Sequence, residues 1–134
     1  MEEFQRQIAN GFLIERVNLT QATVAEAIKF KKHLEADIEL GYKVIIIDLS
    51  NCNTLDSAFI GVMVVTLKQL IRLGGSIKIV KPGMFSKSLL NLTGTIEIFE
   101  IYESLENATA SFSISSKRND DFNTRGLDQL ALAH

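Results

Sequence analysis

An aspartate and a serine stand side by side where the chain passes from one apolar run to the next. Asp56 and Ser57 follow the apolar residues 44–49 after a short polar loop, and they open a second apolar run that ends near residue 73. A serine hydroxyl at the start of a helix can cap the helix, act as a nucleophile or accept a phosphate. The neighbouring residues favour some of these roles over others.

Helix capping is the simplest role for Ser57, because Ser and Asp oxygens accept the free amide hydrogens of a first helical turn. Nucleophilic catalysis would require a base and an orienting acid within reach of the hydroxyl. The two histidines are His33, inside an expected helix, and His134, the last residue, and no Gly-x-Ser-x-Gly motif surrounds Ser57. The sequence therefore argues against serine hydrolysis.

Phosphorylation of Ser57 would act through charge. A phosphate adds about −1.5 to −2 charge and three acceptor oxygens. The free amides and the dipole at a helix N-terminus tolerate an anion, so the fold need not break. Asp56 would lie beside the new charge, and an apolar partner would have to remove water from both. We therefore expect loss of partner binding with little change in fold.

The residues after Ser57 predict a helix over 57–73 with apolar side chains on more than one face. At 100° per residue, one side of this helix forms a core stripe of Ile60, Met63, Val64, Leu67, Leu70 and Ile71. Lys68 and Arg72 lie on the opposite side, which Gly61 and Val65 continue toward Ser57. A neighbouring helix or the C-terminal tail could cover this apolar surface. Because such patches often mark binding sites, we favour a partner protein.

The expected partner surface has two parts, the polar loop 50–54 and the first two turns of the following helix. Its members are Asn53, Thr54, Asp56, Ser57, Phe59, Gly61, Val62 and Met63. Gly61 has no side chain, so a partner backbone could approach closely there. A second copy of the chain is an alternative partner, which would make a homodimer.

The apolar patterns predict a single α/β domain. Asn10-Gly11 between two short strands predicts an N-terminal hairpin, and residues 44–49 predict a central strand covered by helices on either side. Strands and helices then alternate, which favours right-handed crossovers and a mixed, mainly parallel sheet. The expected elements are strands 4–9, 12–17, 44–49, 76–81 and 96–101 and helices 21–40, 57–73, 82–93 and 103–112, with Thr20 or Thr23 as the cap of the first helix.

Composition bounds the class of protein. The chain has 134 residues, 46% of them hydrophobic, and a net charge of −2, which does not favour nucleic acid or an anionic membrane as partner. The N-terminus carries no basic-then-apolar leader, and no apolar run is long enough to span a bilayer, so we expect a cytoplasmic protein. We expect one domain over residues 1–112 and a disordered tail over 113–134, where polar residues dominate.

Other residues that could carry chemistry have simpler interpretations. Asp48, at the end of the central strand, is expected to be a structural acid facing the loop. Cys52 is the single cysteine, which excludes a Cys-rich zinc site, and without an adjacent basic group it is not expected to be reactive. Gly74-Gly75 is a helix stop rather than part of a phosphate-binding loop. The sequence thus indicates neither a metal nor a cofactor.

In combination these features resemble the STAS domain, specifically the bacterial anti-sigma factor antagonists. The resemblance covers roughly residues 1–112 by element order and is strongest in the strand 44–49 followed by Asp56, Ser57 and Gly61. The same order continues with Gly74-Gly75, Pro82 and Leu92-Thr93-Gly94. The resemblance implies a STAS-like fold and a protein without catalytic activity.

In that family, the serine directly after the aspartate is phosphorylated by an anti-sigma factor that is a serine kinase. The resemblance places that role on Ser57. It implies that the unphosphorylated chain binds the kinase and frees the sigma factor, and that a PP2C-type phosphatase reverses the modification. ATP and magnesium would belong to the kinase, and this chain would need no cofactor.

The chain departs from the family pattern in two places. Family members often have Asp-Ser-Ser-Gly, whereas Ala58 and Phe59 follow Ser57 here, which leaves one candidate hydroxyl. Many members have Gly-Glu-Leu-Asp where residues 17–20 read Val-Asn-Leu-Thr, so the acid of that segment is missing. Two alternatives stay open: a STAS scaffold or ligand-binding module in which Ser57 is only a cap, and a small enzyme with a Ser57 nucleophile.

Overall fold

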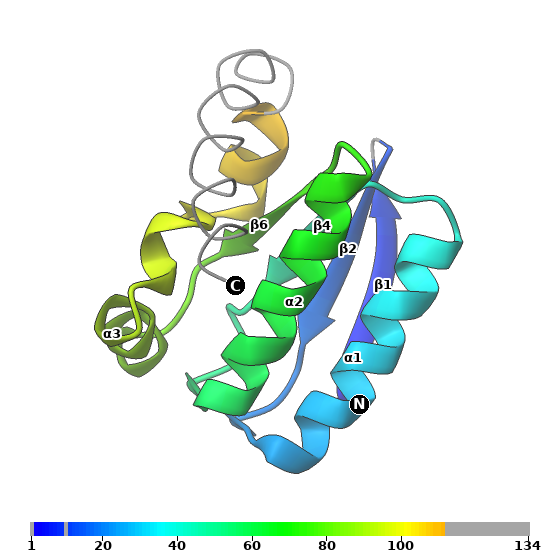
Figure 1. The fold of residues 1–134 in the computed structure, drawn as a ribbon. Helices are drawn as coiled ribbons and strands as arrows, with labels where there is room; N and C mark the ends of the chain where they lie inside the picture. Colours follow the sequence, from blue (N-terminus) through cyan, green and yellow to red (C-terminus); the bar gives the residue numbers. More distant parts are fainter. Residues whose placement is uncertain (1, 10, 112–134) are drawn as a thin grey trace.

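A five-stranded sheet with the strand order β1-β2-β4-β6-β7 organises the molecule (Figure 1). β1 and β2 form the predicted antiparallel hairpin, and β4, β6 and β7 are added in parallel. The strands are β1 (Phe4–Ala9), β2 (Phe12–Val17), β4 (Val44–Asp48), β6 (Ser76–Val80) and β7 (Glu100–Tyr102). The prediction of a mixed, mainly parallel sheet is confirmed.

The structure is a computed structural model that describes residues 2–9 and 11–111. The tail expected at 113–134 lies outside these residues. Within the described residues, no helix combines the length and the apolar character needed to cross a membrane.

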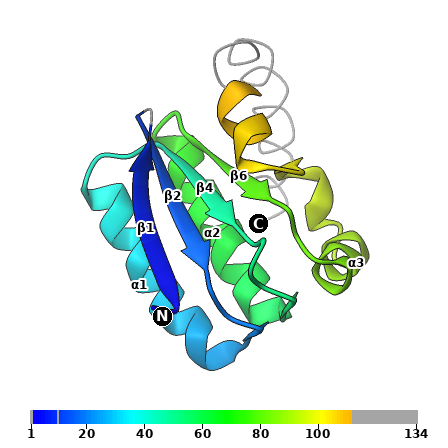
Figure 2. The same ribbon diagram turned by 180° about the vertical axis from the view of Figure 1, so that it is seen from behind.

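Helices lie on both faces of the sheet, as the doubly apolar central strand predicts, but the two layers differ in extent. α1 (Val24–Glu39) and α2 (Ser57–Arg72) lie side by side on one face (Figure 1). On the opposite face, seen in Figure 2, Ala108 of the short helix at 105–111 packs against Ile14, Ile46 and Val80. α3 (Met84–Leu92) lies beyond the β6 side of the sheet.

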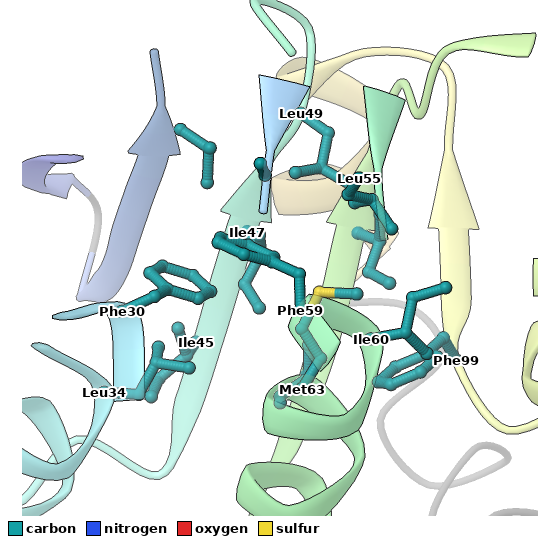
Figure 3. Packing of buried hydrophobic residues seen from close by; sticks show 14 of the residues in the cluster. Phe30, Leu34, Ile45, Ile47, Leu49, Leu55, Phe59, Ile60, Met63 and Phe99 are labelled. Atoms are coloured by element: carbon teal, nitrogen blue, oxygen red, sulfur yellow. The ribbon is translucent and has the colours of Figure 1, made fainter. Parts of the chain in front are cut away.

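The largest hydrophobic cluster lies between the sheet and the helices α1 and α2. Ile45 and Ile47 of β4 are fully buried there. Three aromatic rings from three elements stack across this layer: the Phe4 and Phe30 centroids are 5.0 Å apart, and those of Phe30 and Phe59 are 4.7 Å apart. Figure 3 shows Phe30 and Phe59 among the aliphatic side chains. The stack ties the hairpin to both helices.

The first predicted helix is corrected at its start. The first helix begins at Val24 rather than Gln21, because Gln21–Ala22 forms β3, which pairs in parallel with β5 (Thr54–Leu55). Thr23 occupies the cap position, but its hydroxyl bonds the Glu26 carboxylate instead of a backbone amide.

The predicted strand 96–101 is wrong over its first half. Thr95–Glu97 is a 3-10 helix (η1), and only Glu100–Tyr102 joins the sheet. Gly94 ends α3 with φ of 72°, and the Thr93 hydroxyl donates back to the Leu89 carbonyl at 2.9 Å. Alternating apolar residues therefore serve a tight turn here rather than a strand.

Gly75 is required where the chain enters β6. A Cβ atom at this position would lie 1.8 Å from the Lys43 carbonyl oxygen, a backbone atom that cannot move aside alone. Gly75→Ala is expected to lower the free energy of unfolding by about 2–3 kcal/mol. Urea unfolding measures the change, and Gly61→Ala is the control because its Cβ would meet no atom within 4 Å. Equal stability of the Gly75→Ala variant and the wild type would contradict this close approach.

Candidate functional site

Ser57 lies at the edge of the sheet where the parallel strands end, the edge at which open α/β sheets usually bind ligands. The segment 53–56, which leads into α2, is held by hydrogen bonds to residues 20–22, which precede α1. The amides of Asn53 and Thr54 both donate to the Thr20 carbonyl at 3.1 Å, and the Asp56 amide donates to the Ala22 carbonyl at 3.0 Å. These bonds position the start of α2.

Asp56, and not Ser57, caps α2. The Asp56 backbone is extended, and its Oδ1 accepts a hydrogen bond of 3.1 Å from the Phe59 amide. Ser57 is the first helical residue and is exposed. Within the described residues, its hydroxyl makes no side-chain hydrogen bond, so a modification there would not remove the helix cap.

Phe59 and Met63 were expected on the partner surface, and this expectation is wrong. Both side chains are fully buried. The apolar spacing itself places Met63 on the core stripe, and α1, which packs along the flank of α2, extends the buried part to Phe59 and Thr66. These residues support the site from inside the core and cannot contact a partner.

The other residues of the expected surface are accessible to different degrees. Asn53, Ser57 and Gly61 are exposed, whereas Thr54, Asp56 and Val62 are half-buried. Val65, one turn beyond Gly61, exposes 47% of its surface. The outer side of α2 therefore carries apolar groups from its first turn onward, beginning beside Ser57.

α1 adds two exposed apolar residues that the sequence did not reveal. A shallow hollow lies between the C-terminal ends of α1 and α2. It is lined by Glu35, Ile38 and Glu39 on the α1 side and by Gln69, Arg72 and Leu73 on the α2 side. The helices run in parallel (Figure 1), and Ile28 lies two turns before Glu35 on the same side of α1. Ile28 exposes 60% of its surface and Val24 exposes 59%.

α3 contributes a second exposed apolar group on the β6 side of the site. Met84 and Phe85 expose 81% and 72% of their surface. The preceding Gly83 lies against the loop that leads to Ser57, since a Cβ there would be 2.7 Å from the Asn53 carbonyl oxygen. The sequence signal was the pair of large apolar residues directly after Pro82-Gly83, outside the buried stripe of Ser86 and Leu90.

Within the described residues, no histidine lies beside Ser57 to act as a base. His33 lies elsewhere, with its ring against Phe4 and its Nδ1 3.9 Å from a Glu15 oxygen. Asp48 is a structural acid, as predicted: it accepts from Arg16 Nε at 3.1 Å and from the Ser50 amide at 3.0 Å.

Cys52 is not an alternative reactive group. The residue is buried, and burial raises the pKa of its thiol. Among the residues that the structure describes, no cluster of His, Cys, Asp and Glu could hold a metal ion.

The division of roles between Asp56 and Ser57 gives a direct test. Asp56→Ala removes the cap and is expected to lower the free energy of unfolding by about 1 kcal/mol. Ser57→Ala removes an exposed hydroxyl without a cap bond and is expected to change it by less than about 0.5 kcal/mol. Chemical denaturation of both variants measures the difference. A larger loss for Ser57→Ala than for Asp56→Ala would return the cap role to Ser57.

The fold and sequence of this chain are similar to those of proteins named as anti-sigma factor antagonists. A protein of Thermotoga neapolitana, named as a homologue of the candidate anti-sigma factor antagonist TM1081, is 29% identical over 89 residues, which are 66% of this chain and 79% of that protein. The crystal structure of TM1081 from Thermotoga maritima matches with a TM-score of 0.76 and 28% identity, over 81% of this chain and 92% of that one.

The Bacillus protein SpoIIAA, an anti-sigma factor antagonist, shares the fold at lower identity. Its unphosphorylated form has a TM-score of 0.63 at 13% identity, over 81% of this chain and 94% of that chain. Its phosphorylated form has a TM-score of 0.65 at 15% identity, over 80% of this chain and 96% of that chain. The model of the STAS domain family matches residues 4–108, which is most of the described fold. The chain belongs to the STAS domain family.

Proposed function

We propose that this chain is an anti-sigma factor antagonist in a partner-switching circuit. In its unphosphorylated form it binds an anti-sigma factor that is also a serine kinase, and phosphorylation of Ser57 releases it. The observation that carries the proposal is the position of Ser57: an exposed hydroxyl without a cap bond, at the edge of an exposed apolar surface.

A phosphate on Ser57 would be compatible with the fold. The first amides of α2 have no partner within the helix, and the helix dipole favours an anion at this end. The Asp56 carboxylate already satisfies the Phe59 amide, so the cap stays in place when the neighbouring hydroxyl is modified. SpoIIAA supports this step by fold, since both its phosphorylated and its unphosphorylated forms resemble this structure.

The same phosphate would prevent binding through its charge. An apolar partner surface laid over Gly61, Val62 and Val65 would extend over the neighbouring Ser57. The phosphate and the Asp56 carboxylate would then be desolvated together, at a cost far greater than that of an uncharged hydroxyl. The switch thus needs no conformational change.

Partner binding extends beyond α2 in this proposal. Val24 and Ile28 of α1 continue the apolar surface on one side of Ser57, and Met84 and Phe85 of α3 do so on the other. Asn53 and Thr54 lie between α2 and α3, beside the Gly83 contact. The kinase would supply the ATP and magnesium, a PP2C-type phosphatase would restore the hydroxyl, and this chain would carry out no catalysis.

Phosphate mapping tests the switch residue. After incubation with the cognate anti-sigma factor kinase and ATP, mass spectrometry is expected to find one phosphate, on Ser57, because this hydroxyl is exposed and is not occupied by a cap bond. Ser57→Ala is the matched control and is expected to remain unmodified while still binding the kinase. Modification elsewhere with Ser57 unmodified would contradict the assignment and favour the scaffold alternative.

Gly61 tests the position of the interface independently of the phosphate. Gly61→Gln places a side chain over the open surface of α2, where the backbone leaves room, and glutamine favours a helix more than glycine does. The variant is expected to be at least as stable as the wild type yet to bind the kinase about tenfold more weakly or worse.

The matched control for this test is Gln69→Ala, an exposed position on the same helix about two turns further from Ser57. It is expected to bind like the wild type in isothermal titration calorimetry. Equal affinities of the Gly61→Gln variant and the wild type would place the interface away from α2.

A further inference from the structure

A buried group of charged residues lies between the hairpin and α1, on elements that do not include α2. Arg6 comes from β1, Glu15 from β2, and His33 and Asp37 from α1. The side chains of Glu15 and Asp37 are 0% exposed, although both are carboxylic acids. Glu15 belongs to the sheet face that packs against the helices, where its neighbour on β4 is Ile47.

One guanidinium group serves both carboxyl groups. Arg6 Nη2 lies 2.5 Å from Asp37 Oδ1, and Arg6 Nε lies 3.4 Å from Glu15 Oε2. Arg6 Nη2 also contacts the His33 carbonyl oxygen at 3.4 Å. His33 Nδ1 is 3.9 Å from Glu15 Oε2, too far for a hydrogen bond. These are the charged and titratable side chains that contact Glu15 in the described part of the chain.

The charges of this group do not balance. With both acids ionised, two carboxylates would share one arginine in a site from which water is excluded, and an unbalanced buried charge is strongly unfavourable. Beyond the ion pairs with Arg6, the four carboxyl oxygens of Glu15 and Asp37, all buried, have no hydrogen-bond partner in the described part of the chain. Two ionised carboxylates cannot form a hydrogen bond with each other, because both are acceptors only. A protonated carboxylic acid can donate a hydrogen bond to a carboxylate.

We propose that the Glu15–Asp37 pair retains one proton in the folded protein at neutral pH, and that this shared proton joins the N-terminal hairpin to α1. The pair then carries one negative charge, which Arg6 neutralises. The proton would sit on Glu15, whose ion pair with Arg6 is the longer of the two. This proton-binding site is separate from the Ser57 switch and does not depend on it.

The surroundings of Glu15 favour its protonated form, in agreement with this geometry. Burial raises the pKa of Glu15 from 4.5 to about 8, the Asp37 carboxyl adds to the increase as hydrogen-bond acceptor and as negative charge, and Arg6 opposes it. Because the folded-state pKa is the higher one, folding takes up a proton. The resulting stabilisation is fully present below pH 4.5 and is lost as the pH rises through about 8.

Carboxyl ¹³C NMR of the wild-type protein tests the proposal without any mutation. One glutamate carboxyl resonance is expected to titrate with a midpoint near pH 8, and Glu15→Gln is expected to remove it. The proposal is overturned if every glutamate carboxyl titrates within about one pH unit of the ordinary value near 4.3.

The pH dependence of stability gives a second test. Between pH 7 and 9.5, above the ordinary histidine range, the urea midpoint of the wild type is expected to fall. Glu15→Gln keeps the shape and the hydrogen-bond donor but removes the proton equilibrium, so its midpoint is expected to stay nearly constant. Glu35→Gln, an exposed acid of α1, is the matched control and should follow the wild type. Equal slopes for wild type and Glu15→Gln would overturn the proposal.

Discussion

The burial of Phe59 is the constraint from which the geometry of the functional surface follows. Its ring stacks on Phe30 of α1, which in turn stacks on Phe4 of the hairpin. A helix turns by about 100° per residue, so Ser57 and Gly61, two positions before and after Phe59, lie roughly 200° away around α2. Fixing the aromatic ring in the core therefore directs the serine and the glycine outward. The core and the proposed partner surface are two sides of one helical turn.

The fold separates Ser57, the proposed phosphorylation site, from the groups that hold the structure. Asp56 caps α2, the pairing of β3 with β5 fixes the approach to the helix, and Phe59 fixes its rotation. Ser57 has none of these tasks. A change of charge on its hydroxyl therefore affects what the surface can bind and leaves the bonds that build the surface unchanged. Such independence is what a reversible switch on a small domain requires.

Local patterns were sufficient for much of the fold. The hairpin, the central strand and α2 could be predicted because turn residues and apolar periodicity report directly on these elements, and Asp56-Ser57 stood out because it follows a buried strand. The alternation of apolar residues 96–101 predicted a strand that begins too early, because Gly94 and the Thr93 hydroxyl impose a turn there. Thr23 was one of the two predicted caps, but the pairing of β3 with β5, which keeps Gln21 and Ala22 outside α1, had no signal in the sequence.

Tertiary contacts decided the parts of the site that the sequence could not give. Phe59 is buried because α1 covers one flank of α2, and the exposed Val24 and Ile28 lie on α1, which runs parallel to α2. The group of Arg6, Glu15 and Asp37 was equally hidden, because its members lie on three different elements and each resembles an ordinary surface charge in the sequence.

The most direct test of the central claim is calorimetric titration of the cognate anti-sigma factor kinase with two forms of this protein, unmodified and phosphorylated on Ser57. The phosphorylated form is expected to bind at least about a hundredfold more weakly, a difference of about 2.7 kcal/mol in binding free energy. Equal affinity of the two forms would show that the charge on Ser57 does not control the interface and would contradict the account.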